Sequence, residues 1–538
     1  MTSARTPSVD RVLVVGAGPV GLVAACELAR HGVVPTVIET LTQPTQQSRA
    51  VGVQPRSQEM FSVLGVLDDV LERSLPQHAI EIHSGADPHP LVHVDTTHLG
   101  TSHPTILNLP QTEVETVLRA RAAELGVRIR RGVTLTALSQ DADGVDVTFH
   151  TDGGDESGRF EWVFGADGGH SAVRKLVGSE LHGGFHGSHF AMGDVRVDSP
   201  FARDVTRLFS SADGLTVMLC MQDDRTRLMF QVPEVGEEPP TLEQLQKLAT
   251  QRMGESVRVS EPTWLTYYSI HHAQVPQYRY GRVFLGGDAA HIHSPAAGQG
   301  MNTGMQDAAN LAWKLALVSR GRAGDGLLDS YDEERHPVGA QVVRKATAMA
   351  DAMTFTGIRR EVRDATMGAI GHIDRITHAL AENLAELTVA YHHSPIVHRE
   401  GHRPIGSHTA GDHIVDRYDL TTDGGAPVTL EQLLEHHPGF VLLANAPQND
   451  ELHALQEVLG GVGCVVPVVA SADDAVPGAV VDSAGALSTS LGIGERGIAL
   501  IRPDGYLGYL SASPAAAALR DHLDTTLTRS VLQLFTTS

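Results

Sequence analysis

Short runs of apolar residues, each followed by glycines and then by a helical pattern, recur along the first part of the chain. The first run, VLVV at 12–15, is continuous and rich in valine, as is typical of a strand buried on both faces of a parallel sheet. A helix is predicted over 20–30, with Gly32 as its C-cap, and a second strand over 36–38. Strand, helix and strand in this order predict an α/β domain with a parallel sheet.

Two later strands end in a similar way. Residues 162–164 lead into the loop GADGGHSAVR, and residues 283–285 lead into GGDAAHIHSPAAGQGMN, after which a helical pattern runs through 305–315. Between 181 and 275 the pattern changes to short alternating strands, which predict an inserted antiparallel sheet. The segment 80–107 is expected to contribute strands to that sheet.

The composition argues against two classes of partner. With 41 Lys and Arg against 64 Asp and Glu, the formal net charge is −23, which argues against nucleic acid and against an anionic membrane surface. The three cysteines stand far apart without a CxxC pair, so neither a disulfide framework nor a thiolate metal cage is expected, and a reducing cytoplasm is the natural compartment. We find no apolar segment long enough to predict a membrane span.

The glycines after the first strand have a spacing that indicates a ligand. Gly16, Gly18 and Gly21 form GxGxxG at the opening of the predicted helix, with Pro19 between them, and Glu39 ends the next strand 18 residues after Gly21. In dinucleotide-binding folds such glycines admit a pyrophosphate to the helix N-terminus, and an acid about 20 residues later holds the ribose. An acid rather than a base at this position favours a free 2′-hydroxyl, as in FAD or NAD.

The stretch 282–315 predicts a second part of the site. Its strand leads to Asp288, and a loop with Pro295, Gly298 and Gly300 opens a helix. An acid can accept hydrogen bonds from hydroxyls, and the free N–H groups at the helix N-terminus favour negative charge. The pattern indicates a ligand that is both polyhydroxylated and anionic.

Further polar residues stand in loops beside predicted strands. Arg49 lies in the triplet SRA after the first strand–helix–strand unit, and Gln111 leads into another predicted helix. Asp167, Ser171 and Arg174 follow the strand at 162–164. Asp167, Ser171 and Arg174 are expected to cluster at the carboxyl edge of the sheet, where ligands bind in open α/β folds. Arg49 could contact the flavin side of a bound cofactor, and Gln111 its ribityl chain or ring.

Taken together, the GxGxxG opening, GADGGHSAVR and GGDAAHIHSPAAGQGMN resemble the three fingerprints of the single-component (group A) FAD-dependent aromatic hydroxylases, which have the para-hydroxybenzoate hydroxylase fold. The resemblance covers roughly residues 10–345 and includes the pattern LxxYxxERxP at 328–337. Within the family, the chain is most similar to the branch that tailors aromatic polyketides and to phenol- and hydroxyphenylpropionate-type hydroxylases.

The resemblance implies a set of positions that contact FAD. They are Gly16, Gly18, Pro19, Gly21, Glu39, Arg49, Gln111, Asp167, Asp288, Gly298, Gly300, Met301 and Asn302. Pro295 and Gly298 would lie on the substrate side of the flavin, and Arg174 is a candidate contact for the nicotinamide cofactor. No general base is assigned. The pair His291 and His293 lacks a third ligand nearby, so no metal is expected.

The resemblance also implies the reaction. Reduced FAD would react with O2 to give a C4a-hydroperoxide, which hydroxylates a bulky phenolic or aromatic small molecule, with polyketides as the expected class. NADPH or NADH would bind only transiently, because the chain has no second strand–GxGxxG–helix unit. Two alternatives stay open: Baeyer–Villiger or ring-opening oxygenation of a similar substrate, and a flavin-binding protein without oxygenase activity.

The expected architecture is an α/β protein with a Rossmann-like FAD-binding domain, an inserted mixed or antiparallel substrate sheet and a C-terminal thioredoxin-like α/β domain. The expected boundaries are 1–180 and 276–395 for the FAD-binding domain with its helical region, 181–275 for the substrate sheet, and 404–538 for the C-terminal domain. Residues 392–403 are expected to form a linker. The C-terminal domain lacks CxxC, so a redox role is not expected. We expect a cytoplasmic monomer or homodimer.

Overall fold

The structure is a computed structural model of the 538-residue chain. It describes residues 10–46, 50–293, 298–353, 355, 357–399, 406–445, 449–494 and 496–528. Within this part of the chain, the strands form three eight-stranded sheets and one three-stranded sheet.

The first sheet is built around β1 (Asp10–Val15), which contains the valine-rich run. β1 pairs in parallel with β2 (Thr36–Glu39) and with β11 (Gly154–Gly165), and β11 pairs in parallel with β18 (Val283–Leu285). Val14 in the centre of β1 is fully buried, as expected for a strand covered on both faces. The sheet is completed by β8 (Ile129–Arg131), β9 (Thr134–Gln140), β10 (Val145–Thr151) and β17 (Arg279–Tyr280).

The loops after three of these parallel strands leave the sheet at the same edge. Val15 is aligned with Gly165, and Gly165 with Leu285. Helix α1 (Pro19–Arg30) follows the first loop and packs against α7 (Gly300–Ser319), which follows the third. The three glycine-rich stretches of the sequence therefore meet at one place.

The second sheet is mixed and is largely inserted between the second and third of these loops. Its strands in spatial order are β19 (His291–Ile292), β16 (Arg258–Gln274), β12 (His182–Asp198), β15 (Arg225–Val232), β14 (Gly214–Cys220), β13 (Val205–Ser211), β5 (Ala79–Ser84) and β6 (Pro90–Asp95). β13 and β5 pair in parallel, and the other neighbours are antiparallel. Helix α6 (Leu242–Met253) packs against this sheet.

The segment 80–107 divides between two sheets. β5 and β6 join the second sheet, but the last two residues of the segment lie in β7 (Ile106–Pro110). β7 pairs with β3 (Val51–Val53) and β4 (Leu75–Gln77) in the three-stranded sheet. Because the first four residues of β7 are all buried, this strand needs cover on both faces, which an edge position beside β6 would not provide.

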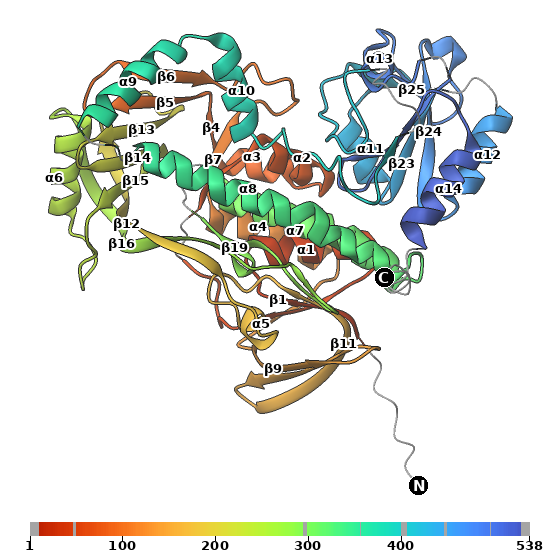
Figure 1. Ribbon diagram of the computed structural model, residues 1–538, viewed down its shortest axis with the longest axis horizontal. Helices are drawn as coiled ribbons and strands as arrows, with labels where there is room; N and C mark the ends of the chain where they lie inside the picture. Colours follow the sequence, from red (N-terminus) through yellow and green to blue (C-terminus); the bar gives the residue numbers. More distant parts are fainter. Residues whose placement is uncertain are drawn as a thin grey trace.

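Helices of 5 to 25 residues accompany the first two sheets. They include α2 (Pro55–Val63), α3 (Leu67–Arg73), α4 (Gln111–Glu124), α5 (Ala172–Leu176), α8 (Asp329–Met353), α9 (Ile358–Ile370) and α10 (Asp374–Leu384). In Figure 1, α8 runs from the side of the second sheet toward the C-terminal region, and α9 and α10 lie over β6. Within the described ranges, every helix is too short or too polar to cross a bilayer.

The third sheet belongs to the C-terminal region. In Figure 1 this region lies at the right, and the second sheet lies at the left. Its strands in spatial order are β20 (His398–Arg399), β27 (Leu507–Ser511), β26 (Ile498–Ile501), β23 (Phe440–Ala444), β24 (Gly463–Val469), β25 (Val480–Val481), β21 (Leu420–Thr422) and β22 (Pro427–Val428). The accompanying helices are α11 (Leu430–His436), α12 (Asn449–Leu459), α13 (Ala486–Leu491) and α14 (Ala516–Leu527). β20 comes from the expected linker at 392–403, so part of that segment is built into the sheet by pairing with β27.

Candidate active site

The three glycines of the first loop serve different purposes. Gly16 has a φ of +105°, and a Cβ there would lie 2.3 Å from the carbonyl oxygen of Ala166; a Cβ on Gly21 would lie 2.0 Å from that of Gly16. These two glycines permit close packing of β1, α1 and the loop after β11. Gly18 differs, because its φ of −75° suits any residue and a Cβ there would meet nothing within 4 Å. The space beside Gly18 is open to a ligand.

The N-terminus of α1 is available to an anion. Gly18 is its N-cap, and the first turn, Pro-Val-Gly-Leu, carries only uncharged residues. Glu39 lies beside the same loop, where its Oε2 accepts the N–H of Ala17 at 2.8 Å and its Oε1 accepts the N–H of Leu41 at 2.9 Å. Its half-buried carboxylate is thus held at the end of β2, the position at which such folds bind a ribose.

A tight turn after β18 presents Asp288. The turn is a single 3-10 turn (Gly287–Ala289), in which Gly287 has a φ of +57°. It packs closely on α7, because a Cβ on Gly304 would lie 2.9 Å from the Cα of Gly287. Asp288 is exposed, whereas the residues on both sides of it are buried. The turn therefore directs one carboxylate out of an otherwise packed segment.

A buried carboxylate on α7 accepts a hydrogen bond from the backbone of this turn. Asp307 is fully buried; its Oδ2 accepts the N–H of Gly287 at 3.0 Å and lies 2.8 Å from His291 Nε2, and its Oδ1 accepts Arg335 Nε at 2.7 Å. Burial alone would raise the pKa of Asp307, but Arg335 and His291 together lower it. Asp307 is therefore an ionised partner of Arg335. His291 belongs to this contact, and the described residues contain no cluster of three potential metal ligands.

The N-terminus of α7 is fixed to the segment after β3. Asn302 is fully buried; its Nδ2 donates to the carbonyls of Gly52 (3.1 Å) and Gly298 (2.9 Å), and its Oδ1 accepts the N–H of Gln54 (3.0 Å). Gly298 has a φ of +62°, a conformation that favours glycine. Because the first turn of α7 is uncharged, the positive end of the helix dipole is available to a negatively charged group.

These elements border one cavity of about 600 Å³, a size typical of ligand sites. Seven of the predicted cofactor positions line it: Gly18, Pro19, Gln111, Asp288, Gly298, Gly300 and Met301. The open space at Gly18, the two uncharged helix N-termini and the exposed carboxylate of Asp288 fit FAD, whose pyrophosphate, flavin ring and ribityl hydroxyls require such groups.

The second sheet contributes a mostly apolar wall to the same cavity. Its apolar members include Ile80, Leu208, Val217, Met229, Trp264 and Tyr268, and Thr206, Thr266 and Ser269 add hydroxyl groups. Tyr268 stacks on Phe190 with ring centroids 5.5 Å apart, and the guanidinium of Arg227 lies 5.5 Å from the ring centroid of Trp264. These contacts hold the two aromatic side chains in place, and such a wall suits a large aromatic ligand.

Asp167 and Arg174, like Glu39 and Asn302, have protein partners in the structure. Asp167 accepts the N–H groups of the first two residues of α5, at 2.6 and 3.1 Å, and so caps that helix, while burial raises its pKa. Arg174 is only 6% exposed and donates to the carbonyls of Gly169 (2.7 Å) and Ala289 (3.0 Å). Arg174 therefore ties the central loop to the Asp288 turn. A contact with a nicotinamide cofactor would compete with these two bonds.

Three site residues have no role in the sequence interpretation: Gln54, Asp307 and Arg335. Gln54 is 3% exposed and lines the cavity, and its Oε1 has no hydrogen-bond partner among the described residues. A buried acceptor without a partner beside a cavity indicates a contact that a ligand would complete. The local sequence QPR around Gln54 carries no recognisable signal for this. Arg49 and Pro295, both predicted at the site, lie outside the described residues.

A buried acid lies behind the N-terminus of α7. Glu386 is 4% exposed, and its carboxylate accepts hydrogen bonds from Thr303 Oγ1 at 2.9 Å and from the amide of Gln306. Burial is the main cause that raises the pKa of Glu386 from 4.5 to about 7, against the lowering effect of these bonds. Glu386 therefore changes its charge within the neutral pH range.

We expect Glu386 to lower the stability of the folded protein as the pH rises. Because its folded pKa lies above its unfolded value, its stabilising contribution is complete below pH 4.5 and is lost as the pH rises through about 7. The full change is about 3 kcal/mol in the free energy of unfolding. The free energy of unfolding, measured with urea near pH 5 and near pH 8, should fall more between these two pH values in the wild type than in Glu386→Gln. An equal loss in both proteins would contradict the assignment.

Similarity to known proteins agrees with this geometry. The family model described as "FAD binding domain" matches residues 10–346. The chain is 34% identical over 509 residues to 6-methylpretetramide 4-monooxygenase of Streptomyces rimosus, which covers 92% of this chain and 90% of that protein. Among solved structures, aklavinone-11 hydroxylase in a ternary complex with FAD and aklavinone matches with a TM-score of 0.80 and 26% identity, covering 97% of this chain and all of that one. OxyS anhydrotetracycline hydroxylase from Streptomyces rimosus matches with a TM-score of 0.77 and 29% identity, covering 96% and 98%.

The likeness extends over nearly the whole chain and includes both the cofactor sheet and the apolar wall. The predicted fold class and the resemblance to flavin-dependent oxygenases are confirmed. This chain belongs to the family of FAD-dependent aromatic monooxygenases.

Proposed function

We propose that this protein hydroxylates a bulky phenolic or aromatic substrate, with FAD as its bound cofactor, NADPH or NADH as a transient reductant and O2 as the oxygen donor. The observation that carries this proposal is the single cavity, bordered both by the dinucleotide loops and by aromatic side chains of the second sheet. The relatives named for 6-methylpretetramide and aklavinone support a polyketide as the substrate class. A cytoplasmic location belongs to the same proposal.

We assign roles to the residues by their positions in and beside the cavity. Gly18 at the N-terminus of α1 would hold the pyrophosphate and Asp288 the ribityl hydroxyls, and both line the cavity. Glu39 lies beside the first loop, outside the cavity lining, and would hold the adenosine ribose. The N-terminus of α7 would stabilise negative charge on the reduced ring. FAD, when bound, supplies electron transfer from NAD(P)H and the activation of O2. The apolar wall would position the substrate ring and exclude water from it.

The proposal is tested by incubating the purified holoprotein with NADPH, O2 and a panel of polycyclic phenols, followed by mass spectrometry of the products. A gain of one oxygen on an intact ring is the expected result. A lactone or a cleaved ring would instead select Baeyer–Villiger or ring-opening oxygenation. If the protein binds FAD but no phenol stimulates its oxidation of NAD(P)H, the result would support the alternative of a flavin-binding protein without oxygenase activity.

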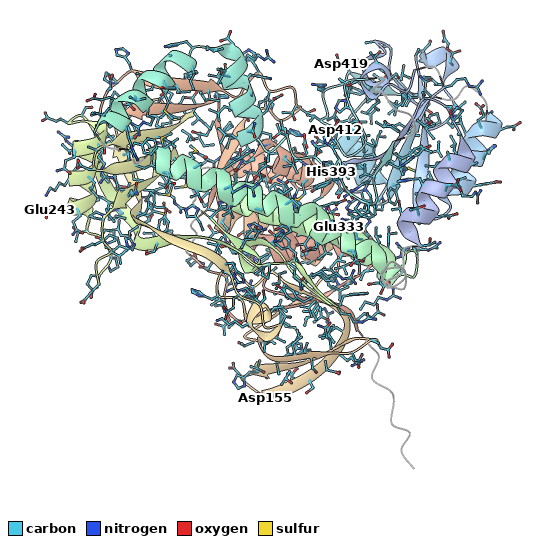
Figure 2. All side chains as sticks on the ribbon, viewed as in Figure 1. Asp155, Glu243, Glu333, His393, Asp412 and Asp419 are labelled. Carbon is cyan, nitrogen blue, oxygen red and sulfur yellow. The ribbon has the colours of Figure 1, made fainter. Side chains whose placement is uncertain are left out.

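Replacing Asp288 by alanine should weaken FAD binding, because it removes the acceptor for the ribityl hydroxyls. Hydrogen bonds to a charged group contribute about 1.5–3 kcal/mol, which corresponds to roughly a 10- to 100-fold rise in the dissociation constant. Fluorescence titration of the apoprotein with FAD measures this dissociation constant. Asp155→Ala is the matched control, because Asp155 is an exposed aspartate on the hairpin of β10 and β11 (Figure 2). Equal FAD affinity in both variants would remove the role given to Asp288.

A further inference from the structure

A turn of the C-terminal sheet is buried against the cofactor domain. The turn joins β26 to β27 and contains Arg502 and Asp504, which are 0% and 9% exposed. A charged hairpin turn ordinarily lies in solvent. Figure 2 labels Glu333 on the part of α8 that faces the C-terminal region, and the next residue, Glu334, receives this turn.

The turn brings opposite charges together in the protein interior. Arg502 donates two hydrogen bonds to the carboxylate of Glu334, at 2.6 and 2.8 Å, and two to that of Asp504, at 3.0 and 2.6 Å. Lys314 of α7 donates to Glu334 at 2.8 Å. Arg502 and Lys314 thus balance the charges of Glu334 and Asp504. The bidentate contact of Arg502 with each carboxylate fixes the orientation of its guanidinium group.

Asp504 extends the contact to two helices of the cofactor domain. Its Oδ2 accepts Asn310 Nδ2 and Trp313 Nε1 of α7, both at 3.2 Å. Its backbone oxygen accepts Arg56 of α2 at 2.6 Å. The turn therefore holds α2, α7 and α8 at once, and α7 is the helix whose N-terminus borders the cavity.

A path of contacts leads from this turn, through neighbouring residues of α8, to the turn that presents Asp288. Arg335 follows Glu334 on α8 and donates to Asp307 at 2.7 Å and to the carbonyl of Thr303, in the first turn of α7, at 3.0 Å. Asp307 in turn accepts the N–H of Gly287, next to Asp288. Arg335 also donates a hydrogen bond to the hydroxyl of Tyr391. The ring centroid of Tyr391 lies 4.2 Å from that of Tyr506 in the C-terminal region.

We propose that Arg502 and Asp504 are positioning residues for the flavin, and that the C-terminal domain serves to fix the N-terminus of α7 and the Asp288 turn. This inference rests on the flavin site of the proposed function. It gives the C-terminal domain a role that requires no thiol chemistry. The two residues act through Glu334, Arg335 and Asp307, without touching the cofactor themselves.

The test compares Arg502→Gln with Arg496→Gln in the full-length protein. Arg496 lies in the same domain but pairs with Glu451 at the surface, with 53% of its side chain exposed, so it is a matched control. We expect Arg502→Gln to raise the FAD dissociation constant at least about tenfold and to change the visible circular dichroism of the flavin at saturating FAD. A variant that loses only stability would show the wild-type flavin spectrum once saturated.

Hydrogen exchange gives a second readout that needs no catalysis. Amides of residues 284–293 and 300–312 should exchange faster in Arg502→Gln than in Arg496→Gln, because the Gly287 N–H bond to Asp307 loses its support. Unchanged exchange together with unchanged FAD affinity would overturn the inference. If Arg502→Gln does not fold, Asp504→Asn keeps the Arg502–Glu334 pair and should show the same changes at smaller size. A wild-type protein that fails to bind FAD would instead refute the proposed function.

Discussion

Valine in place of Gly18 should strongly weaken FAD binding and leave the protein folded. The φ of −75° accommodates valine, and nothing lies within 4 Å of its Cβ, so the apoprotein should keep its stability. The same side chain would occupy the space through which a pyrophosphate reaches the N–H groups of α1. Loss of two charge-assisted hydrogen bonds would raise the FAD dissociation constant by about 100-fold or more. Fluorescence titration and thermal unfolding without FAD measure the two effects separately.

Gly21→Val is the contrasting variant in the same loop. A Cβ there would lie 2.0 Å from the carbonyl of Gly16, so the clash would disrupt packing between α1 and β1 and lower the stability of the apoprotein itself. If Gly18→Val bound FAD within threefold of the wild type, the loop would not be the pyrophosphate site.

Asparagine in place of Asp307 should strongly lower the stability of the folded protein. The change leaves the fully buried Arg335 without its charged partner, and breaking a buried ion pair costs about 3–5 kcal/mol. Because the N–H of Gly287 is bound to the same carboxylate, FAD affinity should fall as well. Denaturant unfolding and FAD titration of the same preparation measure both effects.

Asp146→Asn serves as the control for this prediction. Asp146 also binds an arginine, Arg159, at 2.6 Å, but 57% of its side chain is exposed. Exposed pairs contribute at most about 1 kcal/mol, so this variant should unfold like the wild type. A similar small effect for Asp307→Asn would mean that the buried pair adds little to the stability of the turn.

The cofactor domain could be predicted because its signals are local. Each strand, its glycines and the following helix occupy one short stretch, so Gly18 and Asp288 are recognisable without knowledge of the fold. Asp167 shows the limit of this reasoning, because its carboxylate also accepts N–H groups of the helix that begins after Ser171. The position of Asp167 after a strand does not reveal this second role, and its contact with FAD stays a prediction.

The hydrogen bonds and ion pairs that hold the site residues in place could not be predicted, because the residues that form them are distant in sequence. Asp307 and Arg335 lie on separate helices, and Arg502 comes from another domain. Residues 502–505 lie in the turn between β26 and β27, and a turn motif in a sequence carries no information about what covers it. Burial of such a turn is a property of domain docking and is visible only in the assembled structure.

The order of strands in the first sheet has a consequence for how the protein folds. β1 at the start of the chain pairs in parallel with the nearby β2 and with the distant β11. Because β11 in turn pairs with β18, the sheet is complete only after residue 285 is available. Non-local parallel pairing of this kind slows folding and leaves strand edges exposed in intermediates. Since the proposed FAD site lies where these strands meet, FAD should act late, by trapping the native state and raising the yield of refolded protein.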